Sequence, residues 1–385
     1  MEIVKSPLKN SPEPIYGLVF SGGGARGAYQ AGVVRALYEL SVQLEKPNLF
    51  RILSGVSAGA INAAYMASHI EDLDEATSSM CRLWQNLKAE DVFSTKYSVI
   101  VRNASRVIRG LSFGGLTKYL SPDSIALLDT SPLRNLLGQA VPFSQIQKNI
   151  DGGYLHAASL TATDYTTSLG ITFVQGKKDI PMWHRARRHS VRAKLELDHV
   201  MASSAIPIFF PPTSVDGREY GDGCLRNQAP LSPAVHLGAN RLVVIGVKTS
   251  QRLHIKNTQP MRATLGRIAS VMINAIFMDA IESDLERLHF INQALGQNPQ
   301  SQGTPGLRTI KPFYLKPSKD IAAIAFRHGR RLPRVIRYLM GGLGSQEEHS
   351  DLLSFLLFDP IYCSELVDLG YEDTRRRAAE LELFL

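Results

Sequence analysis

A short apolar run, a tight glycine-containing turn and a helical pattern follow one another twice near the start of this chain. Tyr16 to Phe20 leads into Gly22-Gly23-Gly24, and a helical pattern begins at Ala28. Residues 50–68 repeat the arrangement with a second short strand at 50–53, a turn and an alanine-rich helix. Strands that alternate with helices are typical of a largely parallel sheet covered by helices. The sequence therefore predicts an α/β fold.

Later segments extend this prediction without dividing the chain. Further strands are expected at residues 154–161, 169–174, 241–247 and 310–315, and a long helix at 261–295. Residues 70–150 indicate mainly helices and loops. There is no repeat of fixed period and no Gly/Ser-rich or Pro-rich linker inside the chain, so one large α/β unit preceded by a loose tail at 1–14 is expected.

The charge balance favours anionic partners. Lys and Arg number 43 against 35 Asp and Glu, which gives a net charge of +8. Phospholipid head groups, nucleic acid and acidic metabolites would all suit such a surface. The cysteines are Cys81, Cys224 and Cys363, and their odd number and wide spacing fit neither a disulfide scaffold nor a zinc site. A reducing compartment is therefore the simpler expectation.

The chain contains no segment expected to enter a membrane. Residues 1–14 lack the apolar core of a signal peptide. No stretch approaches the ~18 apolar residues that a spanning helix needs. We expect a cytoplasmic protein, with peripheral attachment to a membrane compatible with its basic charge.

The first motif is Gly22-Gly23-Gly24-Ala25-Arg26-Gly27. It contains the G-x-G-x-x-G pattern of dinucleotide-binding folds, but the second strand runs into Ser54-Gly55 instead of the acidic residue that would bind the ribose. Glycines here also bring unobstructed N–H groups to a helix start, where they can bind an anion such as a developing oxyanion. A glycine-rich turn without a ligand remains the alternative.

The second motif is Gly55-Val56-Ser57-Ala58-Gly59, a G-x-S-x-G match between a predicted strand and a helix. A serine in such a sharp turn exposes its hydroxyl, and the flanking glycines remove side chains that would clash. This position suits a nucleophile. The alternative is that Ser57 only caps the helix that follows it.

A serine nucleophile needs a proton acceptor. None of the ten histidines stands in a context that singles it out. Asp222, in Tyr220-Gly221-Asp222-Gly223-Cys224, is another candidate, because a carboxylate in a water-poor site can act as a base. The alternative is that Asp222-Gly223 is simply a hairpin turn.

In order and spacing these three motifs resemble the patatin-like phospholipase family. The segment from Met201-Ala202-Ser203-Ser204-Ala205-Ile206-Pro207 through Pro211-Pro212 also resembles the family's approach to its aspartate. The resemblance spans roughly residues 16–235. One departure is Cys224, where the family usually has a glycine or alanine after Asp-Gly.

The resemblance implies a three-layer α/β/α fold with a central, mostly parallel sheet. It implies Ser57 as the nucleophile and Asp222 as its base, without a histidine, and an oxyanion hole formed by Gly22, Gly23 and Gly24 with Arg26. No metal or cofactor is implied. The other motif positions would support the geometry of the site, and they are Gly27, Gly55, Gly59 and Gly223.

The function expected is therefore that of a lipid acyl hydrolase of the phospholipase A or lysophospholipase type, with residues 15–235 as catalytic core. Residues 236–385 would complete the α/β unit and add a helical C-terminal extension. A non-lipid esterase, an acyltransferase, and a catalytically silent lipid- or nucleotide-binding module are the alternatives.

Two basic segments bear on the partners of this chain. Residues 184–194 and 327–337 concentrate positive charge that would suit an anionic membrane surface, although a solvated surface would look the same. Nucleic acid is not an expected partner, because no nucleic-acid-binding signature is present and aromatic residues are not interleaved with the charge. The oligomeric state is left open.

Overall fold

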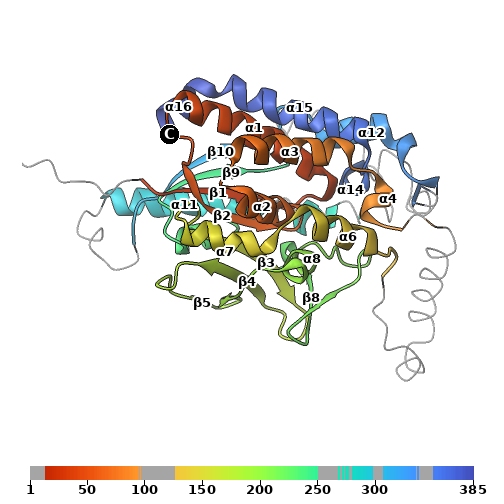
Figure 1. The fold of residues 1–385 in the computed structure, drawn as a ribbon, viewed down its shortest axis with the longest axis horizontal. Coiled ribbons are helices and arrows are strands. Elements are labelled where there is room, and N and C mark those ends of the chain that lie inside the picture. The colour runs from red at the N-terminus through yellow and green to blue at the C-terminus, as the bar shows by residue number, and fades with distance from the viewer. Residues whose placement is uncertain are drawn as a thin grey trace, which may run out of the picture.

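The computed structural model describes residues 14–94, 96, 126–249, 268, 271–272, 274–276, 280–297, 307–334, 336–337 and 350–385. A central sheet crosses the molecule in the order β10-β9-β1-β2-β3-β4-β6-β5, with β8 paired to β3 and β7 paired to β8 (Figure 1). The strands are β1 (Tyr16–Phe20), β2 (Phe50–Val56), β3 (Ala157–Asp164), β4 (Gly170–Gly176), β5 (His184–Arg185), β6 (Arg188–Arg192), β7 (Thr213–Val215), β8 (Arg218–Asp222), β9 (Arg241–Ile245) and β10 (Lys311–Leu315).

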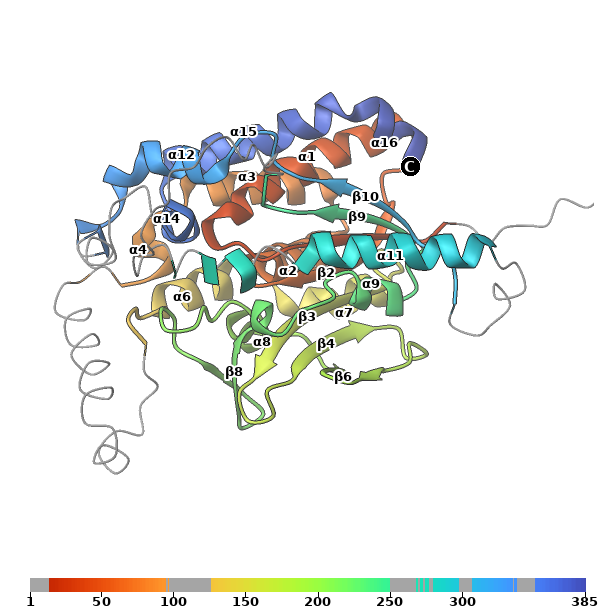
Figure 2. The same cartoon turned by 180° about the vertical axis from the view of Figure 1, so that it is seen from behind.

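Helices cover both faces of this sheet. The larger layer contains α1 and its neighbours, and α9 and α11 lie on the opposite face (Figure 2). The helices are α1 (Gly27–Gln43), α2 (Ala58–His69), α3 (Leu73–Asn86), α4 (Ala89–Val92), α6 (Ser131–Ala140), α7 (Phe143–Asp151), α8 (Leu197–Ser203), α9 (Ser232–His236), α11 (Ala280–Gln297), α12 (Ile321–His328), α14 (Ser350–Leu356), α15 (Pro360–Arg376) and α16 (Ala378–Phe384), with short 3₁₀ turns η1 (Gly24–Arg26), η3 (Gly223–Leu225) and η5 (Gly329–Arg331).

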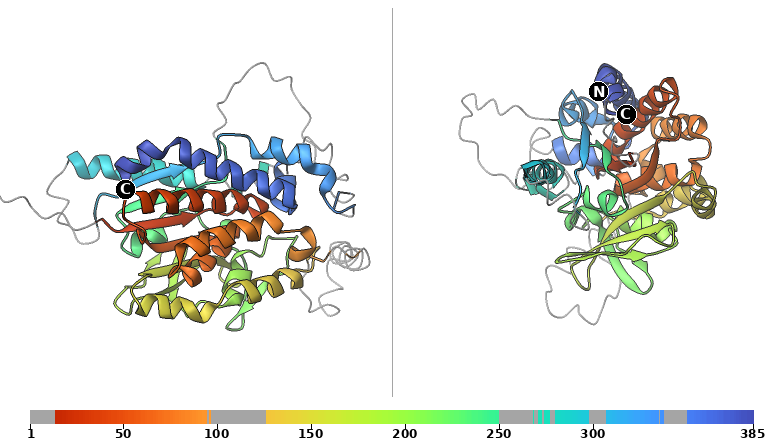
Figure 3. Two further views of the ribbon diagram at one scale, coloured as in Figure 1. Left: turned by 45° about the horizontal axis from the view of Figure 1, so that its top comes forward. Right: turned by 90° about the vertical axis from the view of Figure 1, so that its left-hand side faces the viewer.

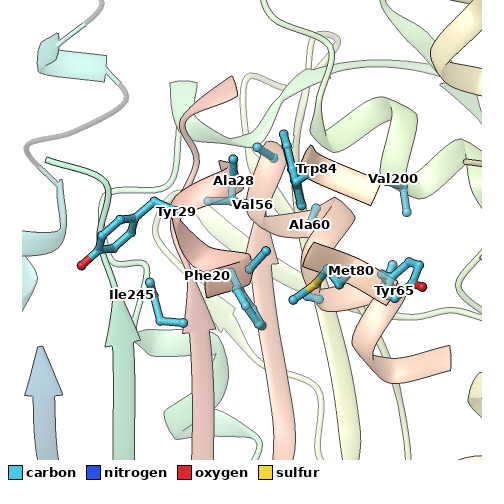
Figure 4. Packing of buried hydrophobic residues seen from close by; sticks show 14 of the residues in the cluster. Phe20, Ala28, Tyr29, Val56, Ala60, Tyr65, Met80, Trp84, Val200 and Ile245 are labelled. Carbon is cyan, nitrogen blue, oxygen red and sulfur yellow. The ribbon is translucent and has the colours of Figure 1, made fainter. Parts of the chain in front are cut away.

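Alternating side chains of the strands pack into these two layers. Leu18 and Phe20 of β1 face the larger cluster, whereas Val19 between them faces the cluster under α9 and α11. This alternation is the period of two expected of a strand buried on both faces. Under the larger layer, Phe20 and Val56 pack with Ala60 and Trp84 (Figure 4). The three-layer α/β/α prediction is confirmed.

The sheet is mostly parallel. β10, β9, β1, β2 and β3 pair in parallel, whereas β4 and β8 run antiparallel to β3. Phe20 and Gly55 are register partners at the carboxyl ends of β1 and β2. The glycine turn after β1 and the serine turn after β2 therefore lie side by side at one edge of the sheet.

Most predicted elements are present with shifted ends. The strand expected at 50–53 continues to Val56, and the one expected at 154–161 begins at Ala157 and ends at Asp164. The helix expected at 261–295 corresponds to α11 and to helical residues at 268, 271–272 and 274–276, while the rest of that prediction lies outside the described residues. The tail predicted at 1–14 also lies outside them, except for residue 14.

The C-terminal helix α15 packs closely along α1, and the two helices lie side by side (Figure 3). A Cβ atom placed on Gly32 of α1 would lie 1.8 Å from the Val367 carbonyl oxygen, and one on Gly370 would lie 2.0 Å from the Tyr29 carbonyl oxygen. Only a residue without a side chain allows the two backbones to approach this closely. The contact ties the last part of the chain to the first helix.

Gly32→Ala should therefore lower the free energy of unfolding by about 1–3 kcal/mol, because the added methyl group forces α1 and α15 apart. The matched control is Gly296→Ala in α11, where an added Cβ meets nothing within 4 Å. That substitution should raise stability by about 0.5–1 kcal/mol through helix propensity. Urea unfolding would measure both changes, and a Gly32→Ala protein as stable as the original would contradict the packing argument.

Candidate active site

Ser57 occupies a strained turn between β2 and α2. Its backbone has φ +56° and ψ −129°, a conformation that non-glycine residues rarely adopt. The flanking glycines permit the turn by close approach. A Cβ on Gly55 would lie 2.1 Å from the Gly59 carbonyl oxygen, and one on Gly59 would lie 2.4 Å from the Phe20 carbonyl oxygen. Local packing thus fixes the direction in which the serine hydroxyl points.

The Ser57 hydroxyl donates a hydrogen bond to the Asp222 carboxylate, with 2.6 Å between Oγ and Oδ2. Both residues are buried, with 1% of Ser57 and none of Asp222 exposed. Ser57 stands at the N-cap position of α2 but its side chain makes no cap hydrogen bond. The interpretation of this serine as a helix cap is therefore wrong.

Asp222 is the last residue of β8, beside Ala162 of β3. Its backbone N–H donates to the Ala205 carbonyl (2.9 Å), and its carbonyl accepts from the Thr163 hydroxyl (2.8 Å). The second carboxylate oxygen, Oδ1, accepts from the Cys224 backbone N–H at 2.9 Å. Hydrogen bonds therefore fix both the backbone and the carboxylate of Asp222.

The hairpin-turn interpretation of Asp222-Gly223 is also wrong. The turn that joins β7 to β8 is Asp216-Gly217, where φ is +49° and +76°. Two successive positive φ angles are the mark of a tight hairpin turn. Gly223 instead begins η3, and a Cβ there would lie 2.0 Å from the Thr161 carbonyl oxygen.

Burial raises the pKa of Asp222 to about 6, while the hydrogen bonds from Ser57 and Cys224 act in the opposite direction. At Asp222 the loss of hydration of the charged form therefore outweighs the stabilisation that these hydrogen bonds provide. A carboxylate with a pKa near 6 is ionised at neutral pH and yet basic enough to accept a proton from a hydroxyl group.

The glycine turn after β1 lies against this pair. A Cβ on Gly22 would lie 3.1 Å from the Ser57 Cβ and 2.3 Å from the Cys224 sulfur. Gly24 has φ +54° and lines the same cavity as Ser57, whereas Gly23 faces Val247. The turn thus lies beside Ser57.

The Arg26 side chain points away from Ser57 and into α14. Its Nε donates to the Ser354 hydroxyl (2.7 Å), its Nη2 pairs with Asp351 (3.0 Å), and its guanidinium lies 4.8 Å from the centre of the Phe355 ring. Only 3% of the residue is exposed. The guanidinium anchors the glycine turn to α14.

Cys224 lies between the two motifs. A Cβ atom on Gly22 would lie 2.3 Å from its sulfur. Burial, together with the nearby Asp222 carboxylate, raises the pKa of the thiol well above its usual value. The thiol is therefore protonated at neutral pH. The cysteine that departs from the usual motif thus fills the space between the glycine turn and the aspartate.

Ser203 is a residue of the site that the sequence did not single out. Its Oγ accepts from the Ser57 backbone N–H (3.0 Å) and donates to the Thr161 carbonyl (2.6 Å). The hydroxyl thereby ties the strained turn to β3. The signal available in the sequence was the segment 201–212, which shares the family pattern but gave no role for this serine.

An apolar cavity opens from Ser57. Its walls come from α2, α3, α6 and the segment after α8, and they include Ile61, Leu137, Ile206 and Phe210. The cavity volume is about 30 Å³, room for about two water molecules. Gly27, the last glycine of the first motif, packs nearby against Trp84, another wall residue.

Within the described residues, the Ser57–Asp222 pair has neither a histidine partner nor a metal site beside it. Among the described residues, no histidine hydrogen-bonds to Ser57 or Asp222. Nor does any group of three or more His, Cys, Asp or Glu side chains lie in an arrangement that could hold a metal ion, within those ranges. Of the helices that the structure describes, none has the length and apolar character needed to cross a membrane.

The sequence of residues 18–235 matches the patatin-like phospholipase family. The chain belongs to this family. A relative is the cGAMP-activated phospholipase of Pseudomonas aeruginosa (strain BWHPSA011 / Pa011), with 27% identity over 291 residues, which are 73% of this chain and 75% of that protein. Family membership supports a lipid ester hydrolase.

Similar solved structures include VipD from Legionella pneumophila, with a TM-score of 0.37 and 14% identity over 96% of this chain and 67% of that one. Human GIVD cytosolic phospholipase A2 in complex with methyl gamma-linolenyl fluorophosphonate gives a TM-score of 0.37 and 12% identity, over 94% of this chain and 60% of that one. Likeness at this level adds nothing to the assignment that the sequence match provides.

The buried carboxylate gives a test of stability. Because folding raises the pKa of Asp222 above its usual 3.8, its ionisation destabilises the folded state progressively as the pH rises from about 4 to about 6. Asp222→Asn should therefore raise the free energy of unfolding by about 2–3 kcal/mol at pH 8, and the gain should vanish below about pH 4.

Asp373→Asn is the matched control for this test. Asp373 is also buried, but it accepts hydrogen bonds from Tyr29, Ser318 and Arg376. Loss of its charge should lower stability at the same pH. Urea unfolding at several pH values would compare the two variants, and an Asp222→Asn protein less stable than the original at pH 8 would contradict the argument.

Proposed function

We propose that this protein hydrolyses fatty-acyl esters of phospholipids or lysophospholipids through Ser57 and Asp222. The observation that carries the proposal is the 2.6 Å hydrogen bond between a serine hydroxyl in a strained strand-to-helix turn and a fully buried carboxylate. A hydroxyl group held in this way has a base within reach and needs little reorganisation to react.

The proposed reaction has two steps. Ser57 Oγ attacks the acyl carbonyl carbon while Asp222 accepts the hydroxyl proton, and the proton then passes to the alcohol that leaves. Water next attacks the acyl carbon of the acyl-enzyme while Asp222 accepts a proton from it. That proton then passes to Ser57 Oγ as the bond between Oγ and the acyl carbon breaks and the fatty acid is released. The N–H groups of the turn Gly22 to Gly24 would stabilise the oxyanion in both steps, and Arg26 would hold that turn in place through α14.

The cavity favours lipid over other esters. Its walls are almost entirely apolar and reach Ser57, which suits a fatty-acyl chain better than a polar acyl group. The volume of about 30 Å³ is too small for such a chain. We propose that wall side chains move apart when the substrate enters.

An acyltransferase or a non-lipid esterase would use the same pair of residues. An acyltransferase would pass the acyl group to an added alcohol, and a non-lipid esterase would prefer short, soluble esters. A silent lipid-binding module would keep the cavity without reacting. Labelling of Ser57 by a fluorophosphonate probe separates that last possibility from all the others, since only a reactive serine is labelled.

A requirement for an activator is part of the proposal. The relative from Pseudomonas aeruginosa is named as cGAMP-activated, and the narrow cavity of this chain calls for an opening motion. Lipid hydrolysis should therefore be assayed with and without cGAMP. If hydrolysis depends on this or another ligand, the narrow cavity described here belongs to an inactive state of the enzyme.

The proposal also assigns roles to the parts of the chain and to its basic segments. Residues 15–235 form the catalytic core, and residues 236–385 complete the α/β unit with a helical extension. The basic segments 184–194 and 327–337 would face an anionic membrane surface. Most of their arginines are exposed, including Arg185, Arg187 and Arg330, as such a role requires.

Ser57→Ala and Asp222→Asn should each lower fatty-acid release from mixed phospholipid vesicles by about 10³-fold or more, because the nucleophile and its base act as one unit. Ser68→Ala removes another buried hydroxyl of α2, one that bonds only to backbone and the adjacent His69, and should retain activity. Release of fatty acid by Ser57→Ala at the original rate would refute the mechanism.

The rate should also depend on pH. Asp222 must be ionised to accept the proton, and its pKa is about 6, so kcat/KM for a soluble ester should rise with pH and level off above a midpoint near that value. The measurement uses initial rates across a buffer series. A rate that is constant between about pH 5 and about pH 8 would exclude Asp222 as the base.

A further inference from the structure

The loop after α8 is unusually apolar for a segment at the surface. Residues 205–212 read Ala-Ile-Pro-Ile-Phe-Phe-Pro-Pro without a polar side chain. Ile208 stands at its tip with 66% of the residue exposed. Ile208 is the exposed residue of this run, whereas Ile206 and Phe210 are buried. An apolar side chain held in water beside an apolar cavity is a candidate contact point for an apolar surface.

Ile208 is also held in a strained backbone. Its φ is +71°, in the left-handed region that β-branched residues avoid because Cβ crowds the neighbouring carbonyl. Glycine or asparagine would fit this position with less strain. Neither the exposure of its side chain nor its backbone conformation favours an isoleucine at this position, which points to a functional reason for the residue.

The loop forms the rim of the apolar cavity. Ile206 and Phe210, on either side of Ile208, line the cavity that reaches Ser57. The Ile208 carbonyl accepts from the Leu127 backbone N–H at 2.9 Å, in the segment that leads into α6. α6 supplies further wall residues, among them Leu137. The tip of the loop is thus flanked by two wall residues of this cavity.

We infer that Ile208 inserts into the acyl region of a lipid surface and docks the mouth of the cavity onto it. The inference rests on the proposed function, since a lipid that delivers an acyl chain between Ile206 and Phe210 brings its surface to Ile208. Apolar side chains at an interface gain by leaving water for the acyl region. In a protein that took its substrate from solution, the same side chain would be exposed to water without any compensating contact.

The test measures binding without hydrolysis. Flotation would compare Ser57→Ala with the double variants that add Ile208→Asn or Ile208→Gly, on vesicles of phosphatidylcholine alone and of equal parts phosphatidylglycerol and phosphatidylcholine. Both substitutions suit a positive φ and should leave the melting temperature unchanged or higher. The control adds Leu383→Asn, which replaces a leucine that is 89% exposed.

Leu383 is a suitable control because it lies near the amino end of β1, whereas Ser57 lies at the carboxyl ends of the parallel strands. The ring of its neighbour Phe384 is 6.2 Å from that of Tyr16, the first residue of β1, whereas Ser57 follows the end of β2. We expect both Ile208 substitutions to weaken vesicle binding by about tenfold or more, equally on neutral and anionic vesicles, and Leu383→Asn to leave binding unchanged.

Several results would overturn the inference. Vesicle binding that Ile208→Asn leaves unchanged, or that occurs only on anionic vesicles, would assign docking to the basic segments instead. Loss of a dimer on gel filtration with Ile208→Asn would mean that a second copy covers the loop. A lowered melting temperature in both variants would mean that the protein's own chain covers it.

The outcome is separable from that of the proposed function. Binding is measured on proteins that lack the Ser57 hydroxyl, so it does not depend on whether Ser57 hydrolyses lipid. A protein that releases no fatty acid but loses vesicle binding with Ile208→Asn would retain the docking surface and lose only the proposed chemistry. The reverse pattern would retain the chemistry and remove the docking surface.

Discussion

A carboxylate without contact with water is the constraint around which this fold is organised. Asp222 has no exposed surface, and the only donors to its side chain among the described residues belong to Ser57 and Cys224. Removing a carboxylate from water destabilises its charged form strongly, and these few hydrogen bonds return only part of the loss. Asp222 stays in this place because its backbone is bonded on two sides. Its carbonyl accepts from Thr163 of β3, and its N–H donates to the Ala205 carbonyl.

The glycine turn is fixed from two sides by buried charged groups. On one side, Gly22 lies against Cys224 and Ser57, next to the Asp222 carboxylate. On the other side, Arg26 leaves the turn for α14, where Ser354 and Asp351 bind its guanidinium. Between these anchors the backbone has little freedom to shift. Donors that are already in place when charge develops on a substrate need no reorganisation at that moment.

Much of this arrangement follows from local sequence. Glycines at 22–24 and at 55 and 59 allow few backbone paths, and parallel pairing of the strands before them brings both turns to one edge. The chain contains Asp-Gly at 216–217 and at 222–223, and each could be a hairpin turn. Pairing of β7 with β8 makes 216–217 the hairpin turn. Asp222 instead ends β8 beside Ala162 of β3, a pairing between residues about 60 positions apart.

Local sequence patterns could not predict contacts between residues that are far apart in the chain. The glycine motif predicts a turn but not that Arg26 would reach Asp351, which follows it by 325 residues. Ser203 reads as one of two serines in a family segment until the fold places its hydroxyl between Ser57 and Thr161. Likewise, the composition of residues 205–212 indicates a buried segment. The exposure of Ile208 becomes apparent only in the folded structure.

The sequence match to the family ends at residue 235, but the sheet does not end there. β9 pairs with β1 along its whole length, and β10 then covers β9. A protein cut after the matched region would leave β1 as an open edge, with unpaired N–H and carbonyl groups flanked by Leu18 and Phe20. Such an edge is a template for pairing with other chains. A shortened version should therefore aggregate, even though it would retain every residue that the motifs identify.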